Sequence, residues 1–185
     1  MDLLDTIRER KSIRKYKTDP VPEAVLLQVF EAGRLAPSWA NTQTWRFILV
    51  SEAETKARLS EALTSNNPAR QAFIDAPHII CLAAQKGISG LKKGEPVTNK
   101  GDWFMFDAGI AMEHIALAAW NFGLGTCHVG AFDAKKVEEV LEIPEGYAIV
   151  EMTPVGYPDE KPQPRPRKPL SELLYRDRFG KTFLE

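Results

Sequence analysis

DWFMFDAGIAMEHIALAAWNF, residues 102–122, is the stretch that decides the fold. It has the length of a long helix, it ends at Gly123, and apolar side chains occur nearly all the way round it. A helix of this kind lies in the centre of a hydrophobic core or is shared between two subunits. The sequence allows both the core and a subunit interface, because small side chains on this helix would let a helix of either subunit approach closely. These small residues are Ala108, Gly109, Ala111, Ala116, Ala118 and Ala119.

The composition is that of one globular domain covering residues 1–185. Hydrophobic residues make up 44% and charged residues 26% of the chain, as in ordinary soluble proteins. The net charge of −1 argues against a binder of nucleic acids or membrane surfaces, which is usually basic throughout. The first residues show no secretory pattern, so a cytoplasmic protein is expected. Cys81 and Cys127 form no C-x-x-C pair and are expected to be buried thiols.

Shorter elements surround the long helix. Ser51 and Glu54 form a capping-box signature for one of them, and Asp133 is a cap for another. Helices are predicted at 2–11, 22–36, 51–63, 67–75 and 133–141, and strands at 45–50, 78–84, 125–132 and 147–157. Residues 85–101 have no period and are predicted to be a mobile surface loop. Because this order lacks the strict βαβ alternation of a doubly wound sheet, it indicates an α+β or three-layer fold.

A basic segment, RKSIR at 10–14, follows the first predicted helix. In an extended conformation the side chains of Arg10, Ser12 and Arg14 share one face. Two guanidinium groups beside a hydroxyl suit a phosphate monoester, which accepts charge-assisted hydrogen bonds. The alternative is a solvated basic helix end that complements the helix dipole.

A second basic segment, RPRKP, lies far away in the tail at 165–169. Arg165 and Arg167 alternate there as well, and prolines restrict the backbone between them. A stiff segment suits a fixed pair of guanidinium groups, so both segments could face the same anion. A disordered basic linker is the alternative.

A glycine turn, HVGAF at 128–132, follows one of the predicted strands. The backbone N–H groups of Gly130 and Ala131 could donate to the edge of a heteroaromatic ring, or the segment is only a tight turn. The sequence contains no G-x-G-x-x-G, P-loop, G-x-S-x-G or H-E-x-x-H motif, and its three histidines have no metal-ligand spacing. An enzyme without such a constellation usually takes its chemistry from a cofactor.

Four segments in this order resemble the FMN-dependent nitroreductase family. They are RKSIRKY (10–16), APSWANTQTWRF (36–47), GLGTCHVGAFD (123–133) and RPRKPL (165–170). The resemblance implies an α+β, three-layer sandwich whose central mixed or antiparallel sheet is flanked by helices, one of them long and central. It also implies a homodimer with two FMN molecules at the subunit interface, a variable lid at 85–104, and an extended tail at 158–185 that packs on the partner subunit.

The resemblance also implies which residues contact FMN. They are Arg10, Lys11 and Ser12 at the phosphate and ribityl chain, Arg14 near the pyrimidine edge, Arg165 and Arg167 at the phosphate, and Val129, Gly130 and Ala131 at the N5/O4 edge. From the partner subunit, a loop with Pro37, Ser38, Trp39 and Asn41 is expected to lie against the flavin. No catalytic side chain and no metal ligand is implied, since the chemistry belongs to flavin N5.

The implied reaction is a ping-pong cycle in one pocket. NADH or NADPH passes hydride to flavin N5 and leaves, and an electron-poor small molecule such as a nitroaromatic or a quinone then takes its place. Relatives of this fold that dehalogenate iodotyrosines or cleave reduced flavin give one alternative. A nucleic-acid-binding or interaction protein that uses its basic segments gives another, although neither a nucleic acid nor a membrane is the expected partner. No role is assigned to His128, and no ribityl contact is assigned within 66–77.

Overall fold

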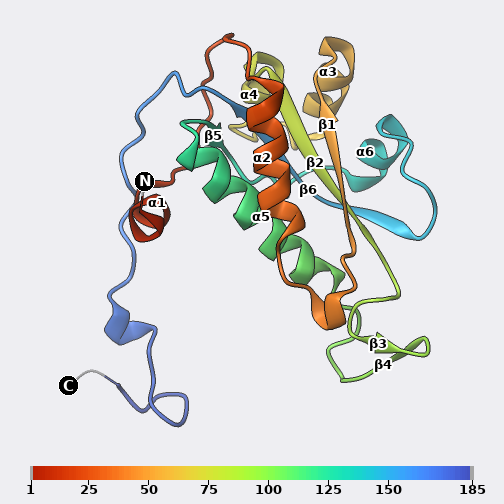
Figure 1. The fold of residues 1–185 in the computed structure, drawn as a ribbon, viewed down its shortest axis with the longest axis vertical. Coiled ribbons are helices and arrows are strands. Elements are labelled where there is room, and N and C mark those ends of the chain that lie inside the picture. Colours follow the sequence, from red (N-terminus) through yellow and green to blue (C-terminus); the bar gives the residue numbers. More distant parts are fainter. Residues whose placement is uncertain (1, 184–185) are drawn as a thin grey trace.

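The computed structural model describes residues 2–183. At its centre is a four-stranded sheet in the order β1-β2-β6-β5 (Figure 1). Each pair of neighbouring strands is antiparallel. The strands are β1 (Trp45–Val50), β2 (His78–Gln85), β5 (Gly125–Thr126) and β6 (Tyr147–Gly156).

Helices cover both faces of this sheet, and the side chains of β2 alternate between two cores. Ile80 and Leu82 belong to one core, and Ile79 and Cys81 to the other. The helices of the first core are α2 (Glu23–Arg34) and α5 (Phe104–Asn121), and those of the second are α3 (Ala53–Ala62), α4 (Arg70–Asp75) and α6 (Ala134–Val140). Successive strand residues face opposite sides, so the uninterrupted apolar run of β2 matches a strand covered on both faces. The α+β, three-layer prediction is confirmed.

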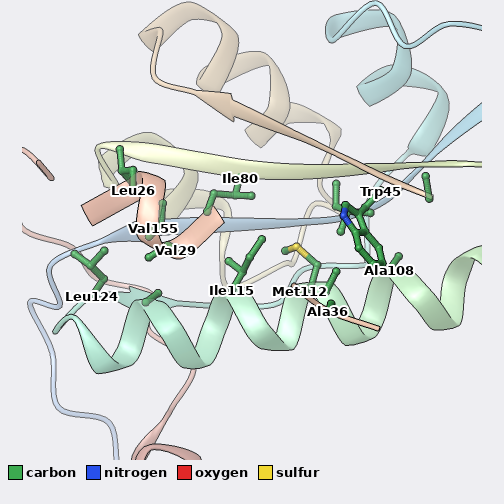
Figure 2. Packing of buried hydrophobic residues seen from close by; sticks show 14 of the residues in the cluster. Leu26, Val29, Ala36, Trp45, Ile80, Ala108, Met112, Ile115, Leu124 and Val155 are labelled. Atoms are coloured by element: carbon green, nitrogen blue, oxygen red, sulfur yellow. The ribbon is translucent and has the colours of Figure 1, made fainter. Parts of the chain in front are cut away.

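The stretch that decides the fold forms α5, which is buried on one face only. Met112 and Ile115 are fully buried against the sheet and α2 (Figure 2). On the outer face, the exposed fractions of Met105 and Phe106 are 55% and 59%. One face of the helix is therefore core, and the other is an apolar surface of the single chain.

The first helix, α1 (Leu3–Glu9), also presents apolar side chains to solvent. Leu3 and Leu4 have exposed fractions of 64% and 63%, whereas only Thr6 of this helix is buried. An amphipathic helix normally buries its apolar stripe. This stripe finds no cover within the described chain.

The tail begins as part of the body and then leaves it. After β6, the backbone N–H of Asp159 donates to the carbonyl of Lys15 at 2.9 Å. The chain then runs outward along the side of the domain as an extended segment with a short 3-10 turn at Leu170–Glu172 (Figure 1). Leu170 and Leu173 are each 59% exposed. No helix in residues 2–183 combines the length and apolarity needed to cross a bilayer.

Local predictions had mixed outcomes. The Ser51/Glu54 capping box was wrong: α3 begins after Glu52 without a side-chain cap, and the Ser51 hydroxyl bonds to Nδ1 of His78 at 2.7 Å instead. Asp133 does cap α6, accepting from the N–H of Lys136. Cys81 and Cys127 are buried free thiols, as predicted.

Two predicted segments differ in extent. The unperiodic loop 85–101 contains a short hairpin of β3 (Leu91–Lys92) and β4 (Glu95–Pro96). The strand predicted at 125–132 is regular only over β5. Beyond β5 the chain keeps single bridges, such as Val129 to Met152, because the backbone turns away from the sheet there.

Candidate functional site

The basic segment 10–14 runs extended beside β5, to which one parallel bridge, between Ser12 and Thr126, joins it. Arg10 ends α1 with extended backbone angles, and the N–H of Ile13 donates to the carbonyl of Thr126 at 2.9 Å. Ile13 is 1% exposed. A Cβ at Gly125 would lie 2.6 Å from Cγ1 of Ile13, so only glycine lets the two strands approach this closely.

The alternating residues Arg10, Ser12 and Arg14 all influence the ionisation of one buried thiol. Burial raises the pKa of the Cys127 thiol, while Arg14, a hydrogen bond with Ser12 and, more weakly, Arg10 counter this increase. All three side chains therefore act on the same neighbour. That the three side chains share one face stays a prediction.

The tail fixes the far end of this strand. The carboxylate of Glu160 accepts from the backbone N–H of Arg14 at 2.5 Å and from that of Lys15 at 3.2 Å. The hydroxyl of Tyr16 donates to the carbonyl of Ile13 at 2.7 Å. These bonds bind the backbone and leave the arginine side chains free to face the sheet.

Two guanidinium nitrogens in this cluster are buried without a partner. Nη1 of Arg10 and Nε of Arg14 find no hydrogen-bond acceptor among residues 2–183, and the Arg10 side chain is only 15% exposed. Burying a charged donor without an acceptor is costly. Guanidinium donors bind phosphate oxygens strongly, so the pair has the chemistry required to hold the anionic end of a nucleotide cofactor.

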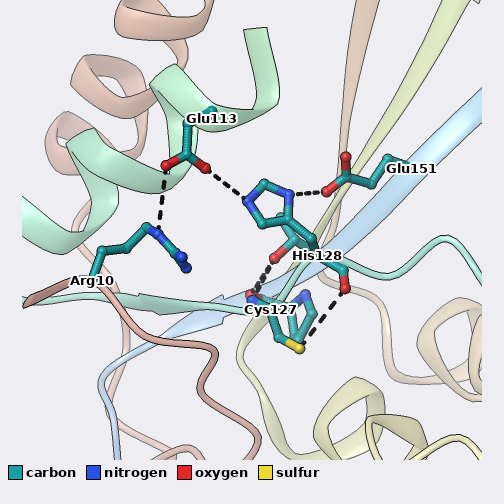
Figure 3. A network of polar contacts seen from close by, with 7 residues as sticks. Arg10, Glu113, Cys127, His128 and Glu151 are labelled. Carbon is teal, nitrogen blue, oxygen red and sulfur yellow. Dashed lines mark hydrogen bonds and ion pairs between the residues drawn. The ribbon is translucent and has the colours of Figure 1, made fainter. Parts of the chain in front are cut away.

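A chain of ionic contacts links Arg10 to the glycine turn (Figure 3). Nε of Arg10 lies 3.5 Å from Glu113 on α5, and the other oxygen of Glu113 lies 3.1 Å from Nε2 of His128. Nδ1 of His128 contacts the carboxylate of Glu151 on β6. Hydrogen bonds to Glu113 and Glu151 raise the pKa of His128 to about 9. Burial opposes ionisation of Glu113, but His128 and Arg10 outweigh it and lower the pKa of that carboxyl.

The glycine turn, which directly follows His128, presents backbone N–H donors that have no acceptor in the described part of the chain. Val129 is buried and exchanges two hydrogen bonds with Met152, at 2.9 and 3.1 Å. Gly130 and Ala131 follow at the surface, and within the described residues neither backbone N–H has an acceptor. The carbonyl of Ala131 accepts from Asn67. The turn is thus anchored on both sides while its N–H groups remain available.

The loop predicted to reach a partner's flavin lies at the N-terminal end of α5 (Figure 1). The N–H of Trp39 donates to Asp107 at 3.0 Å, and Ala40 and Asn41 have positive φ angles of 46° and 58°. Pro37 and Asn41 are exposed, and Ser38 and Trp39 are half-buried. No hydrogen bond or ion pair within residues 2–183 joins this loop to the segment 10–14. Within the described chain, no polar contact therefore connects the two predicted halves of the site.

Comparison with protein-family models identifies the family of the chain. The model described as "Nitroreductase family" matches residues 7–157. The chain belongs to this family. Among solved structures, a nitroreductase family protein from Clostridium novyi NT is 32% identical, with a TM-score of 0.79 and coverage of 99% of this chain and 97% of that one. An FMN-dependent nitroreductase from Clostridium difficile R20291 is 27% identical, with a TM-score of 0.80 and coverage of 95% and 99%.

The proteins similar to this chain are named for different activities. An NADH dehydrogenase from Thermus thermophilus is 28% identical over 94% of this chain and 95% of its own. An iodotyrosine deiodinase from Thermotoga neapolitana is 26% identical over 94% of this chain and 96% of its own. Both similarities cover nearly the full length of each protein, so they concern the whole domain.

In this member of the family, Lys11 lies apart from the arginine cluster. It lines a cavity of about 860 Å³ on the other side of the strand, together with Lys17, Trp120 and Tyr157. Neighbouring residues of an extended strand point in opposite directions, which explains the separation. A contact between the Lys11 side chain and the phosphate stays a prediction.

Arg165 and Arg167 are exposed in the extended tail. Neither forms a hydrogen bond or an ion pair with a residue in the described part of the chain. Their convergence with Arg10 on one phosphate stays a prediction as well. Residues 2–183 contain no group of three or more histidine, cysteine or carboxylate side chains placed to hold a metal ion.

Sequence reasoning missed Glu113 and Glu151 and the partners of His128. The two glutamates come from α5 and β6 and meet only through tertiary packing. In the sequence, Glu113 is one acid in an apolar helix and Glu151 is one in a strand. An acid within an apolar helix or strand rarely lacks a partner, so the positions of these two glutamates could have indicated that each pairs with a cation.

Proposed function

We propose that this nitroreductase is an FMN-dependent oxidoreductase that uses NADH or NADPH to reduce an electron-poor small molecule. The observation that carries this proposal is the buried pair Arg10 Nη1 and Arg14 Nε, which have no acceptor within residues 2–183. An anionic cofactor supplies the acceptors that the described chain does not. Membership of the family and the FMN-dependent relative support FMN as that cofactor.

Each part of the site has a task in this proposal. Arg10, Lys11 and Ser12 would hold the phosphate and ribityl chain, which requires the Lys11 side chain to turn from the cavity that it lines. Arg165 and Arg167 would close on the phosphate from their exposed positions. Arg14 would lie at the pyrimidine edge and stabilise the negative charge that reduction places there, since a fixed cation needs no reorganisation when the charge appears. Bound FMN would supply the hydride chemistry between the nicotinamide and the acceptor.

The glycine turn would orient the ring. The N–H groups of Gly130 and Ala131 would donate to the N5/O4 edge, and buried Val129 anchors them through its two bonds to Met152. The turn is fixed before the cofactor binds. Preorganised donors of this kind hold a ring at a defined position with little entropy loss on binding.

We also propose that the active form is a homodimer. Apolar side chains of α1, α5 and the tail are more than half exposed, and exposed apolar patches often mark interaction surfaces. They are Leu3, Leu4, Ile7, Met105, Phe106, Leu170 and Leu173. A groove of about 660 Å³ on the outer face of α5 contains Phe106, Ile110 and Glu113, so this face borders the site. A second copy would cover it and bring its own residues 37–41 to the flavin.

The test begins with the purified protein. A yellow preparation with one FMN per chain is expected, and anaerobic addition of NADH or NADPH should bleach it. A panel of nitroaromatics and quinones should then restore the colour at different rates. A protein that does not bind FMN, or a bound flavin that neither nicotinamide bleaches, would overturn the proposal.

A dehalogenase is the second candidate, supported by the full-length similarity to the iodotyrosine deiodinase. Adding iodotyrosine to the bleached enzyme separates the two: iodide release favours the dehalogenase, and reoxidation only by nitroaromatics or quinones favours the reductase. The nucleic-acid-binding alternative has less support. Arg10 is largely buried and faces Glu113, whereas residues that contact a nucleic-acid backbone lie open on the surface.

A further inference from the structure

His128 lies between two carboxylates that come from different elements. Its Nε2 is 3.1 Å from Glu113 on α5, and its Nδ1 contacts Glu151 on β6. A neutral imidazole donates from only one ring nitrogen, and a carboxylate only accepts. Both contacts are therefore hydrogen bonds only when the ring carries two protons and a positive charge.

The charges around this ring cancel when it is protonated. Arg10 and the His128 imidazolium are the cations, and Glu113 and Glu151 are the anions of one contact chain. If the ring lost its proton, the contacts among Arg10, Glu113, His128 and Glu151 would carry a net charge of −1. The nearest other charged or titratable groups are Arg14 on the strand 10–14, His114 on α5 and the Cys127 thiol.

Glu113 bridges two cations, because one of its oxygens faces Arg10 and the other faces His128. The Arg10 contact, at 3.5 Å, involves Nε only, and Nη1 has no acceptor within residues 2–183. If His128 released Glu113, the carboxylate would be free to form a bidentate pair with Arg10. That pair would occupy the donors that a phosphate needs.

We propose that His128 is a positioning residue that balances the charge of the cofactor site: its imidazolium holds Glu113 and so leaves the free edge of Arg10 to the phosphate of FMN. The inference rests on the proposed function, since it assigns to His128 a part in binding that cofactor. It also gives the exposed side chain before the glycine turn a task other than proton donation to substrate.

The consequence is a pH-dependent affinity for FMN. The pKa of His128 is raised to about 9 by Glu113 and Glu151. Below this pH the site is balanced and binds the phosphate dianion well. As pH rises through about 9 the ring loses its proton, and the affinity should fall roughly tenfold, the factor that corresponds to one pKa unit of coupling between ring and ligand.

The experiment is a fluorescence titration of FMN with the full-length protein, stripped of flavin, between pH 7 and about pH 9.5, where the phosphate stays a dianion. Wild type should bind tightly at pH 7 and about threefold more weakly at pH 9.5, because one pKa unit of coupling spreads the tenfold loss over about pH 9 to 10 and above. His128→Gln should bind roughly tenfold more weakly at pH 7 and show no weakening through the same window. His78→Gln removes a histidine that is hydrogen-bonded to Ser51 and not to Glu113 or Glu151; it is the matched control and should behave like wild type.

A charge-compensating variant separates charge balance from structural damage. The double variant Glu113→Gln/His128→Gln removes one anion together with the cation, so its FMN affinity should return to within about threefold of wild type. An NMR titration of the His128 imidazole without FMN should give a midpoint near 9 in the wild type. A purely structural role would not produce this rescue.

The outcomes are distinguishable from those of the proposed function. If wild type does not bind FMN at any pH, the proposed function fails. If wild type binds FMN but His128→Gln binds it equally well at pH 7, or if the double variant stays as weak as the single one, the inference about His128 is overturned while the FMN enzyme stands.

Discussion

The buried carboxylate of Asp107 accepts a hydrogen bond from the backbone N–H of Trp39 at 3.0 Å. Its other oxygen accepts from the hydroxyl of Ser89 at 2.6 Å. Trp39 lies in the loop 37–41 and Ser89 in the lid, so the first turn of α5 fixes both segments. The proposed dimer would use this one anchor to set the loop that reaches the partner's flavin.

Replacing Asp107 with alanine should destabilise the protein by about 2–4 kcal/mol, because the buried Ser89 hydroxyl and the half-buried Trp39 N–H would lose their acceptor. Asp107→Asn should cost less, since its oxygen can still accept from Trp39 and its amide can donate to Ser89. Urea unfolding measures both. Asp19→Ala, at an exposed position, is the control and should change stability by less than about 0.5 kcal/mol. Equal losses in the alanine and asparagine variants would contradict this explanation.

Gly125→Ala and Gly33→Ala form a matched pair of overpacking variants. The added Cβ would lie 2.6 Å from Ile13 Cγ1 at the first position and 2.8 Å from Ile115 Cγ1 at the second. Both should destabilise the fold by about 1–3 kcal/mol. Only Gly125→Ala pushes on the strand 10–14, so only this variant should also weaken FMN binding. A comparable loss of FMN affinity in both would mean that the strand position is not what matters.

Replacing Arg14 with glutamine should make the bound flavin harder to reduce. Loss of a cation near the pyrimidine edge should lower the midpoint potential by roughly 30–60 mV, equivalent to about 1.4–2.8 kcal/mol for a two-electron couple. A spectroscopic redox titration gives this value directly. Arg58→Gln on α3 is the control. An unchanged or higher potential in Arg14→Gln would argue against Arg14 at that edge.

Stability should depend on pH through His128. The pKa is raised in the folded protein, from 6.5 to about 9, so the stabilisation is fully present below 6.5 and disappears as pH rises through about 9. The side chain is 33% exposed, so screening should reduce the effect to about 1–2 kcal/mol. Wild type should be more stable than His128→Gln at pH 6, and the difference should vanish near pH 10. A constant difference across this range would refute the linkage.

Charge on the outer face of α5 should break the proposed dimer. Phe106→Glu places a carboxylate where the exposed fraction of the native side chain is 59%, so a monomer should tolerate it. Sedimentation analysis should show a dimer for wild type and a monomer for the variant. Leu49→Glu, on β1 and away from this face, should remain dimeric. A wild-type monomer at micromolar concentration would contradict the proposal.

The fold could be predicted to the extent that local pattern determines it. The uninterrupted apolar run of β2 and the apolar length of α5 identified the central sheet and helix correctly. The hairpin at 91–96 was missed because its strands are two residues each, too short for any alternation. The capping box was wrong because Ser51 bonds to His78, a neighbour that only the pairing of β1 with β2 provides.

The candidate site could be predicted less completely. The alternation of Arg10, Ser12 and Arg14 follows from strand geometry and needs no tertiary information. Glu113 and Glu151 reach His128 only because α5 and β6 pack on opposite sides of it, which no local pattern encodes. Arg165 and Arg167 lie in a tail that contacts little of its own chain, so their role depends on binding partners.

The central claim is that the guanidinium groups of Arg10 and Arg14, each with one buried nitrogen that has no acceptor within residues 2–183, bind FMN. A crystal structure grown with FMN tests it most directly. The measurement is the distance from Nη1 of Arg10 to the nearest phosphate oxygen. The account predicts about 2.9 Å, a charge-assisted hydrogen bond, with Arg14 at the pyrimidine edge of the same molecule. A flavin bound in the cavity beside Lys11 and Lys17, with Arg10 still unpaired, would contradict it.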